Sequence, residues 1–168
     1  MQTSVTIKTI YNCSLERAFK TPILCDVTKV HTGFWGVMPK VINTVGNTDW
    51  GKPGSSKKIM VAKSLTYKEG EAFTDKVIER KENQYWIIEL SGFTTFMFGF
   101  TKFVGKWATT ELAPNKILIE YTYVLHSQIP WLYPLNWLFT KIFWRLYMKQ
   151  VLNNIRKLAY NNEPYQYE

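Results

Sequence analysis

Hydrophobic and polar residues alternate along most of the first three quarters of the chain, and this period of two predicts β-strands. The first run covers residues 3–11, and a short one covers residues 41–45. Longer runs follow at residues 57–64, 71–81, 85–91, 98–112 and 116–127. The short spacers Glu69-Gly70, Glu82-Asn83 and Pro114-Asn115 are typical of hairpin turns. The pattern therefore predicts an antiparallel, meandering sheet of about six to seven strands.

The hydrophobic period changes to 3.6 near the end of the chain. From Trp131 to about Asn161 the apolar positions fit one long helix of roughly eight turns. Two short helices are expected after the first strand: Ser14 resembles an N-cap for residues 15–20, Pro22 ends that helix, and residues 23–30 form the second. This order predicts an α+β fold in which a strongly twisted sheet curls around the long C-terminal helix.

A curled sheet and one helix do not fill space well, so a cavity between them is expected. Alternation in the last strand places Tyr121 and Tyr123 on its apolar face, where their hydroxyls would bond to protein groups or meet a ligand. In the strand before it, Gly105 lies between large aromatic residues and leaves room for a cavity wall. The same reasoning selects inward residues on the other strands and on the helix. The expected ligand-binding residues are Phe73, Val77, Trp86, Ile88, Phe103, Trp107, Tyr121, Tyr123, Leu138 and Ile142.

Composition adds two features to this picture. The 168 residues suit a single domain, residues 1–168, and 46% of them are hydrophobic. Aromatic residues reach 16%, a surplus that points to a cavity, an exposed apolar surface or both. Three segments that should be loops are rich in apolar residues, namely 33–37, 92–100 and 129–137. They either cap the core or form a cavity mouth that contacts a membrane or another protein.

The formal net charge of +8 favours an anionic partner, either nucleic acid or anionic lipid. The basic residues of the strands are scattered, without an arginine-rich run, so nucleic acid is the less favoured partner. Residues 129–148 are apolar but include Lys141 and Arg145, which disfavours a membrane span. The opening residues do not have a signal-peptide pattern, and a cytoplasmic protein is expected.

Few residues could carry catalysis. The acid–base candidates are Glu89, Glu120, Asp75, His126 and His31, and Glu89 is the best placed because it lies within an apolar strand. No nucleophile elbow, phosphate-binding loop or dinucleotide-binding motif occurs. Cys13 and Cys25 cannot form a disulfide framework, and with two His they do not suggest a metal site. No cofactor or metal is expected.

Four segments resemble a known superfamily. They are VTIKTIYNCSLERAF, DWGKPGSSKKIMV, the pair FVGKWATTEL and KILIEYTYVL, and the helix WLFTKIFWRLYMKQVLNNIRKLA. Their order is similar to that of the START and birch-pollen-allergen-like (SRPBCC) superfamily, and most similar to its polyketide cyclase/dehydrase-like and lipid-transport branch. The resemblance implies the helix-grip fold and a hydrophobic small molecule or lipid bound between sheet and helix.

The resemblance leaves the activity open, because no fixed catalytic motif defines this branch. It favours a binding or transport protein over an enzyme. The alternatives are a polyketide cyclase or dehydratase that uses the same cavity, with Glu89 or a Tyr as its acid–base group, and an interaction module with a filled core.

Overall fold

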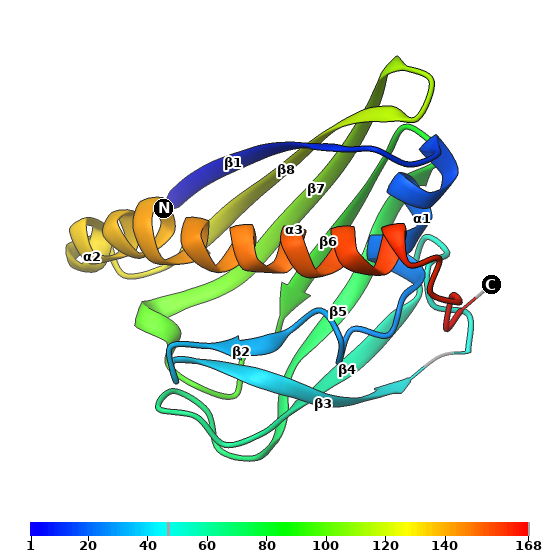
Figure 1. Cartoon of the computed structure of the whole chain (residues 1–168). Helices are drawn as coiled ribbons and strands as arrows, with labels where there is room; N and C mark the ends of the chain where they lie inside the picture. The colour runs from blue at the N-terminus through cyan, green and yellow to red at the C-terminus, as the bar shows by residue number, and fades with distance from the viewer. Residues whose placement is uncertain (47, 168) are drawn as a thin grey trace.

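The structure is a computed structural model that describes residues 1–46 and 48–167. It contains one curled antiparallel sheet and a long helical segment near the C-terminus, as Figure 1 shows. The strands are β1 (Gln2–Tyr11), β2 (Thr32–Phe34), β3 (Met38–Gly46), β4 (Ser56–Val61), β5 (Gly70–Lys81), β6 (Tyr85–Ser91), β7 (Phe100–Ala113) and β8 (Lys116–Ser127). The helical elements are α1 (Leu15–Leu24), η1 (Met97–Gly99), η2 (Pro130–Leu132), α2 (Tyr133–Leu138), η3 (Phe139–Trp144) and α3 (Arg145–Tyr160).

The sheet has eight strands in the order β1-β8-β7-β6-β5-β4-β3-β2, so β1 and β2 form its two edges. From β2 to β8 each strand pairs with the next one along the chain, which is the expected meander. The first strand then pairs antiparallel with the last, and Val5 lies opposite Tyr123. The predicted helix-grip arrangement is confirmed. The sheet has one strand more than expected, because the three residues of β2 form in a segment whose glycines predict a loop.

The long helix lies across the concave face of the sheet (Figure 1). Residues of α3 such as Met148, Val151 and Ile155 are buried in the same apolar cluster as Ile119 and Leu125 of β8. Within this helix, η3 is a π-helical stretch, in which backbone bonds span five residues instead of four. The core therefore lies between the hollow of the sheet and one face of α3.

One helix follows the first strand, where the sequence predicts two. Ser14 is its N-cap, since the hydroxyl accepts from the backbone N–H of Arg17 at 3.2 Å. Pro22 lies inside this helix instead of ending it. Proline has no backbone N–H, so the helix loses one hydrogen bond near its last turn and still continues to Leu24. The N–H of Cys25 still donates to the carbonyl of Thr21, and the residues that follow form turns.

Candidate ligand-binding site

A cavity lies between the concave face of the sheet and α3. Its volume is about 80 Å³, counted as the space open to the centre of a water-sized sphere. That is room for several water molecules or a small organic molecule. Strands β3 to β8, the segment between α1 and β2, and helix α3 all contribute to its mostly apolar wall. The wall is thus assembled from most of the fold.

Most of the predicted sheet residues lie in this wall. They are Phe73, Trp86, Ile88, Phe103, Tyr121 and Tyr123. Val77 and Trp107 are fully buried on the same side of the sheet but do not line the cavity. Alternation thus identified the concave face, although only part of that face borders empty space.

The structure does not bring the two predicted helix residues to the cavity. Leu138 and Ile142 are about half exposed on the outer face of the helix, where the exposed Leu146 continues their spacing of four. The residues of the helix that line the cavity are Trp144, Tyr147, Met148, Val151 and Ile155. The sequence misled here because the helix is apolar on two faces in its first half, and the π-helical stretch shifts the phase between α2 and α3.

Aromatic rings fill much of the space that the curl of the sheet creates. Trp86 and Trp107 stack with centroids 5.7 Å apart, and the ring of Tyr121 meets both edge-on. The Tyr121 and Tyr123 hydroxyls bond to each other at 2.6 Å. The room beside Gly105 is occupied by the Tyr123 ring, since a Cβ on Gly105 would lie 2.9 Å from that ring. The glycine therefore permits close packing instead of opening the cavity.

Two charged residues are buried in the cavity wall, Lys57 of β4 and Asp75 of β5. They are direct partners in the β4–β5 ladder, and their exposed fractions are only 2% and 9%. Neither Lys57 Nζ nor Asp75 Oδ1 has a hydrogen-bond partner among the described protein groups. The amine lies over the Trp50 ring, whose centroid is 3.9 Å from Nζ. Such a pair is costly to bury, which points to a use beyond packing.

Burial shifts the pKa of both groups toward neutrality. Desolvation lowers the pKa of Lys57 to about 8, although the nearby Asp75 carboxylate opposes this. Desolvation raises the pKa of Asp75 to about 6, against the Lys57 charge and the Lys76 backbone N–H, which both lower it. Both groups can therefore exchange protons near neutral pH.

A third polar group comes from the segment between α1 and β2. His31 lines the cavity, and its Nδ1 lies 2.6 Å from the hydroxyl of Tyr147 on α3. Desolvation, aided by the Lys57 charge, lowers the pKa of His31 to about 4, so the imidazole is neutral at pH 7. This bond connects α3 to the segment between α1 and β2.

Glu89, the best placed acid–base candidate in the sequence, lies outside the cavity. Its neighbours Ile88 and Leu90 line the cavity, so Glu89 is on the convex face, where its carboxylate lies 3.1 Å from Lys102 Nζ. Glu120 likewise pairs with Lys8 on that face. Asp75 is the only one of the predicted carboxylates that lines the cavity.

Sequence reasoning missed Lys57, although a signal was present. Lys57, Ile59 and Val61 alternate in β4, and all three are buried and line the cavity. A lysine in register with two inward apolar residues is the pattern that identifies it. The described residues contain no group of three or more His, Cys, Asp or Glu that could hold a metal ion.

Comparison with known proteins gives matches in structure alone. No protein-family model and no curated protein matches the sequence. Norcoclaurine synthase of Thalictrum flavum, solved as a point mutant in complex with a transition-state analogue, superposes with a TM-score of 0.67 at 12% identity over 98% of each chain. The structure of Ara h 8.0201 superposes with a TM-score of 0.68 at 14% identity over 96% of this chain and 99% of that one.

These structures belong to the birch-pollen-allergen-like group, so the fold that the sequence resemblance implied is confirmed. The chain has the helix-grip fold over nearly its whole length. At such low identity the likeness shows the fold alone.

Proposed function

We propose that this protein binds or transports a hydrophobic small molecule or lipid in the cavity between its sheet and α3. The observation that carries the proposal is a mostly apolar cavity that also holds two buried charged side chains, whose Lys57 Nζ and Asp75 Oδ1 atoms lack a hydrogen-bond partner among the described residues. Ligand sites have this composition, since apolar walls supply affinity and a few polar groups fix orientation. A second structure of norcoclaurine synthase supports it, because that protein was solved with dopamine and hydroxybenzaldehyde and superposes with a TM-score of 0.65 at 12% identity.

Affinity would come from apolar area removed from water, at about 25 cal/mol per Å². The cavity as it stands holds only a small molecule, and a longer lipid would require the surrounding side chains to move. Met148 and Met97 in the wall suit such adjustment, because unbranched methionine side chains repack easily. Selectivity would come from Lys57, Asp75 and the His31–Tyr147 pair.

The alternative is an enzyme of the polyketide cyclase or dehydratase kind that acts in the same cavity. Asp75 and Lys57 favour it, because both have pKa values near the pH at which a general acid or base works. Asp75→Asn separates the two functions: a carrier still binds an apolar probe, because its affinity comes from the apolar wall, and an enzyme loses turnover. Glu89→Gln is the matched control on the convex face.

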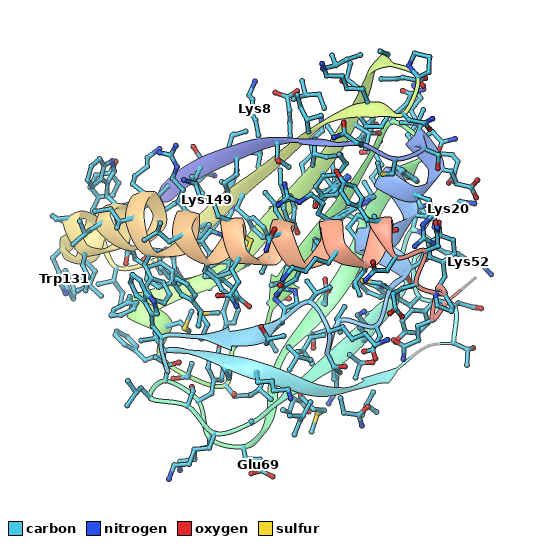
Figure 2. All side chains as sticks on the ribbon, in the orientation of Figure 1. Lys8, Lys20, Lys52, Glu69, Trp131 and Lys149 are labelled. Atoms are coloured by element: carbon cyan, nitrogen blue, oxygen red, sulfur yellow. The ribbon has the colours of Figure 1, made fainter. Side chains whose placement is uncertain are left out.

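Contact with an anionic membrane is a further part of the proposal. Eight exposed apolar side chains form what we call the aromatic end: Trp35, Phe96, Trp131, Tyr133, Leu135, Trp137, Leu138 and Ile142. They come from three segments that meet around η3, since Trp35 contacts Phe143 and Phe98 contacts Phe139. Trp131 is 81% exposed and projects from the tip of this end (Figure 2).

The charge of the helix suits such a membrane. Residues 130–160 include five basic and no acidic residues. Arg145 and Lys149 are exposed along the helix that leads away from the aromatic end. Exposed tryptophans next to basic residues are typical of proteins that bind anionic lipid surfaces. Among the described residues no helix has the length and apolar character needed to cross a membrane.

The cytoplasm remains the proposed location. Both cysteines, Cys13 and Cys25, are free thiols, which agrees with a reducing compartment.

The proposal is tested by native mass spectrometry of the purified protein, with organic extraction of whatever co-purifies, and by titration with the uncharged fluorescent probe N-phenyl-1-naphthylamine. We expect a co-purified apolar molecule or saturable probe binding. Val41→Phe narrows the cavity and should weaken probe binding at least tenfold. Val5→Phe is the matched control, since Val5 is also buried but does not line the cavity. An empty protein that binds no probe would favour the interaction module instead.

A further inference from the structure

The Lys57 amine is buried where its charge has little support. Its Nζ has no hydrogen-bond partner among the described groups, and the Trp50 ring lies 3.9 Å away on one side. The Tyr167 ring lies 5.2 Å from the same nitrogen. Aromatic faces stabilise a cation only in part, and they do not satisfy its N–H donors. The N–H donors of the amine therefore remain available to an acceptor group on a ligand in the cavity.

The Asp75 carboxylate also has one oxygen without a hydrogen-bond partner. Asp75 Oδ1 lacks a hydrogen-bond partner, and Asp75 is the residue directly opposite Lys57 in the ladder. Asp75 pairs in turn with Leu90, and Leu90 with Phe103, so this polar pair continues directly into the apolar floor of the cavity. A ligand that lies along this floor would place its polar end at the two groups.

We propose that Lys57 captures the carbonyl group of an apolar aldehyde as an imine, with Asp75 as the neighbouring acid–base group. The inference rests on the proposed function and names the ligand chemistry of the same cavity. A neutral carbonyl is favoured over a fatty-acid carboxylate, because an ionised ligand would add a second negative charge beside Asp75.

The chemistry balances without any oxidant or reductant. Lys57 reacts as the neutral amine and Asp75 as the carboxylic acid. The nitrogen attacks the carbonyl carbon, a C–N bond forms, and Asp75 donates its proton to the carbonyl oxygen. The Asp75 carboxylate then accepts a proton from the nitrogen and passes it to the new hydroxyl group, the C–O bond breaks, and water leaves. The products are the protonated imine, the Asp75 carboxylate and one water molecule, and the imine cation stays beside that carboxylate and the Trp50 ring.

Burial supplies the reactive form of the amine. With the pKa of Lys57 near 8, roughly a tenth of the side chain is neutral at pH 7, far more than for an exposed lysine. Lys58, the next residue, is an internal control, since its exposed amine lies 2.9 Å from the Glu71 carboxylate.

The test is reductive trapping with hexanal and sodium cyanoborohydride at pH 7, followed by peptide mapping. We expect a single hexyl group on Lys57, added at least tenfold faster than on Lys58. Asp75→Asn should slow this labelling at least tenfold. A role of Asp75 as a counter-charge alone predicts the reverse, because its removal lowers the pKa of Lys57 and frees more neutral amine.

Three outcomes separate this inference from the function on which it rests. Trapping at Lys57, absent in a folded Lys57→Met variant, supports it. Hexanal that displaces N-phenyl-1-naphthylamine but labels Lys57 no faster than Lys58 overturns the imine and leaves the cavity as a binding site. A protein that binds neither the probe nor hexanal overturns both. The comparison of Lys57 with Lys58 uses the unmodified protein, so it does not depend on any variant folding.

Discussion

The ionisable side chains of the cavity differ from those of the surface in how far they are hydrated. On the convex face, pairs such as Glu89–Lys102 remain hydrated and contribute little to stability. Inside the cavity, Lys57 and Asp75 have lost most of their hydration, and this loss changes their pKa values more than their mutual attraction does. The same residue types are therefore hydrated ion pairs on one face of the sheet and desolvated groups with shifted pKa values on the other.

Replacing Asp75 by Asn should remove the destabilisation of the folded state that the buried Asp75 carboxylate causes at neutral pH. The folded-state pKa of Asp75, about 6, is above its unfolded value of 3.8, so its contribution to stability is present at low pH and is lost as pH rises through 6. Between pH 4.5 and 7.5, Asp75→Asn should gain about 2 kcal/mol in unfolding free energy relative to the unmodified protein.

Denaturant unfolding at several pH values measures this difference. His31 and Lys57 also titrate, and His31, with its lowered pKa, adds stability as pH rises from 4 to 6.5. Because both proteins contain His31, its contribution cancels. Removal of Asp75 lowers the pKa of Lys57 further, so the Lys57 contribution rises with pH in the variant and acts in the same direction as the expected gain. A difference between Asp75→Asn and the unmodified protein that does not change with pH would show that this carboxylate is not buried.

The elements show which features of the fold the sequence predicts. The strands were predictable because one face of the sheet is buried and the other is hydrated, so the period of two appears in β6 and β8 alike. The same pattern located Tyr121 and Tyr123 correctly on the concave face. It could not separate residues that border the cavity from those that pack behind it, such as Trp107, because that depends on which rings meet in space.

The face of the C-terminal helical segment that points toward the cavity was less predictable. Leu138 and Ile142 fit an amphipathic pattern, but the inward face of the helix is set by η3, whose wider turn changes the angle between α2 and α3. A π-helical turn has no reliable sequence signal, and here it occurs where Thr140 bonds outside the helix. Its hydroxyl lies 2.6 Å from that of Thr3 on β1 and donates to the carbonyl of Asn136.

The Thr3–Thr140 contact should therefore stabilise the docking of the helix on the first strand. Both residues are buried. Thr140→Val leaves the Thr3 hydroxyl without its partner and should cost about 1–2 kcal/mol, whereas Thr3→Val should cost less, because the Thr140 hydroxyl still donates to the Asn136 carbonyl. The double variant should cost less than the sum of the two, because removing both hydroxyls leaves neither unsatisfied.

A double-mutant cycle measured by denaturant unfolding gives the coupling energy. Thr6 and Thr122 are the matched control, since their hydroxyls lie 2.8 Å apart between β1 and β8 but are exposed to water. We expect a coupling near zero for the control pair. A similar coupling for both pairs would show that the buried contact does not hold the helix.

At the scale of the whole molecule, the cavity and the aromatic end share the same helical segment. Trp144 of η3 and Tyr147 of α3 line the cavity, and Phe139 and Phe143 of η3 support the exposed rings of the aromatic end. The Phe139 and Phe143 rings stack with centroids 5.2 Å apart. A displacement of the exposed rings at this end can therefore shift the cavity wall through side chains that contact one another.

This arrangement predicts two separable contributions to membrane binding. Lys and Arg attract the protein to anionic lipid over a distance that salt shortens, whereas tryptophan insertion depends little on salt. Binding to vesicles of phosphatidylcholine with a third phosphatidylserine should weaken at least tenfold between 50 and 500 mM salt, a range set by the Debye length of about 10 Å at 0.1 M. Combining Trp131→Ala and Trp137→Ala should weaken binding by a similar factor at every salt concentration.

Vesicle sedimentation measures both effects, and two leucines supply the control. Leu135 is 41% exposed at the aromatic end, and Leu112 is 51% exposed near the β7–β8 turn, which lies away from α2 (Figure 1). Leu135→Ala should weaken binding, and Leu112→Ala should not, although it removes the same atoms from a similarly exposed position. If the two variants bind alike, the aromatic end does not face the membrane, and attraction by the net charge of +8 is the whole interaction.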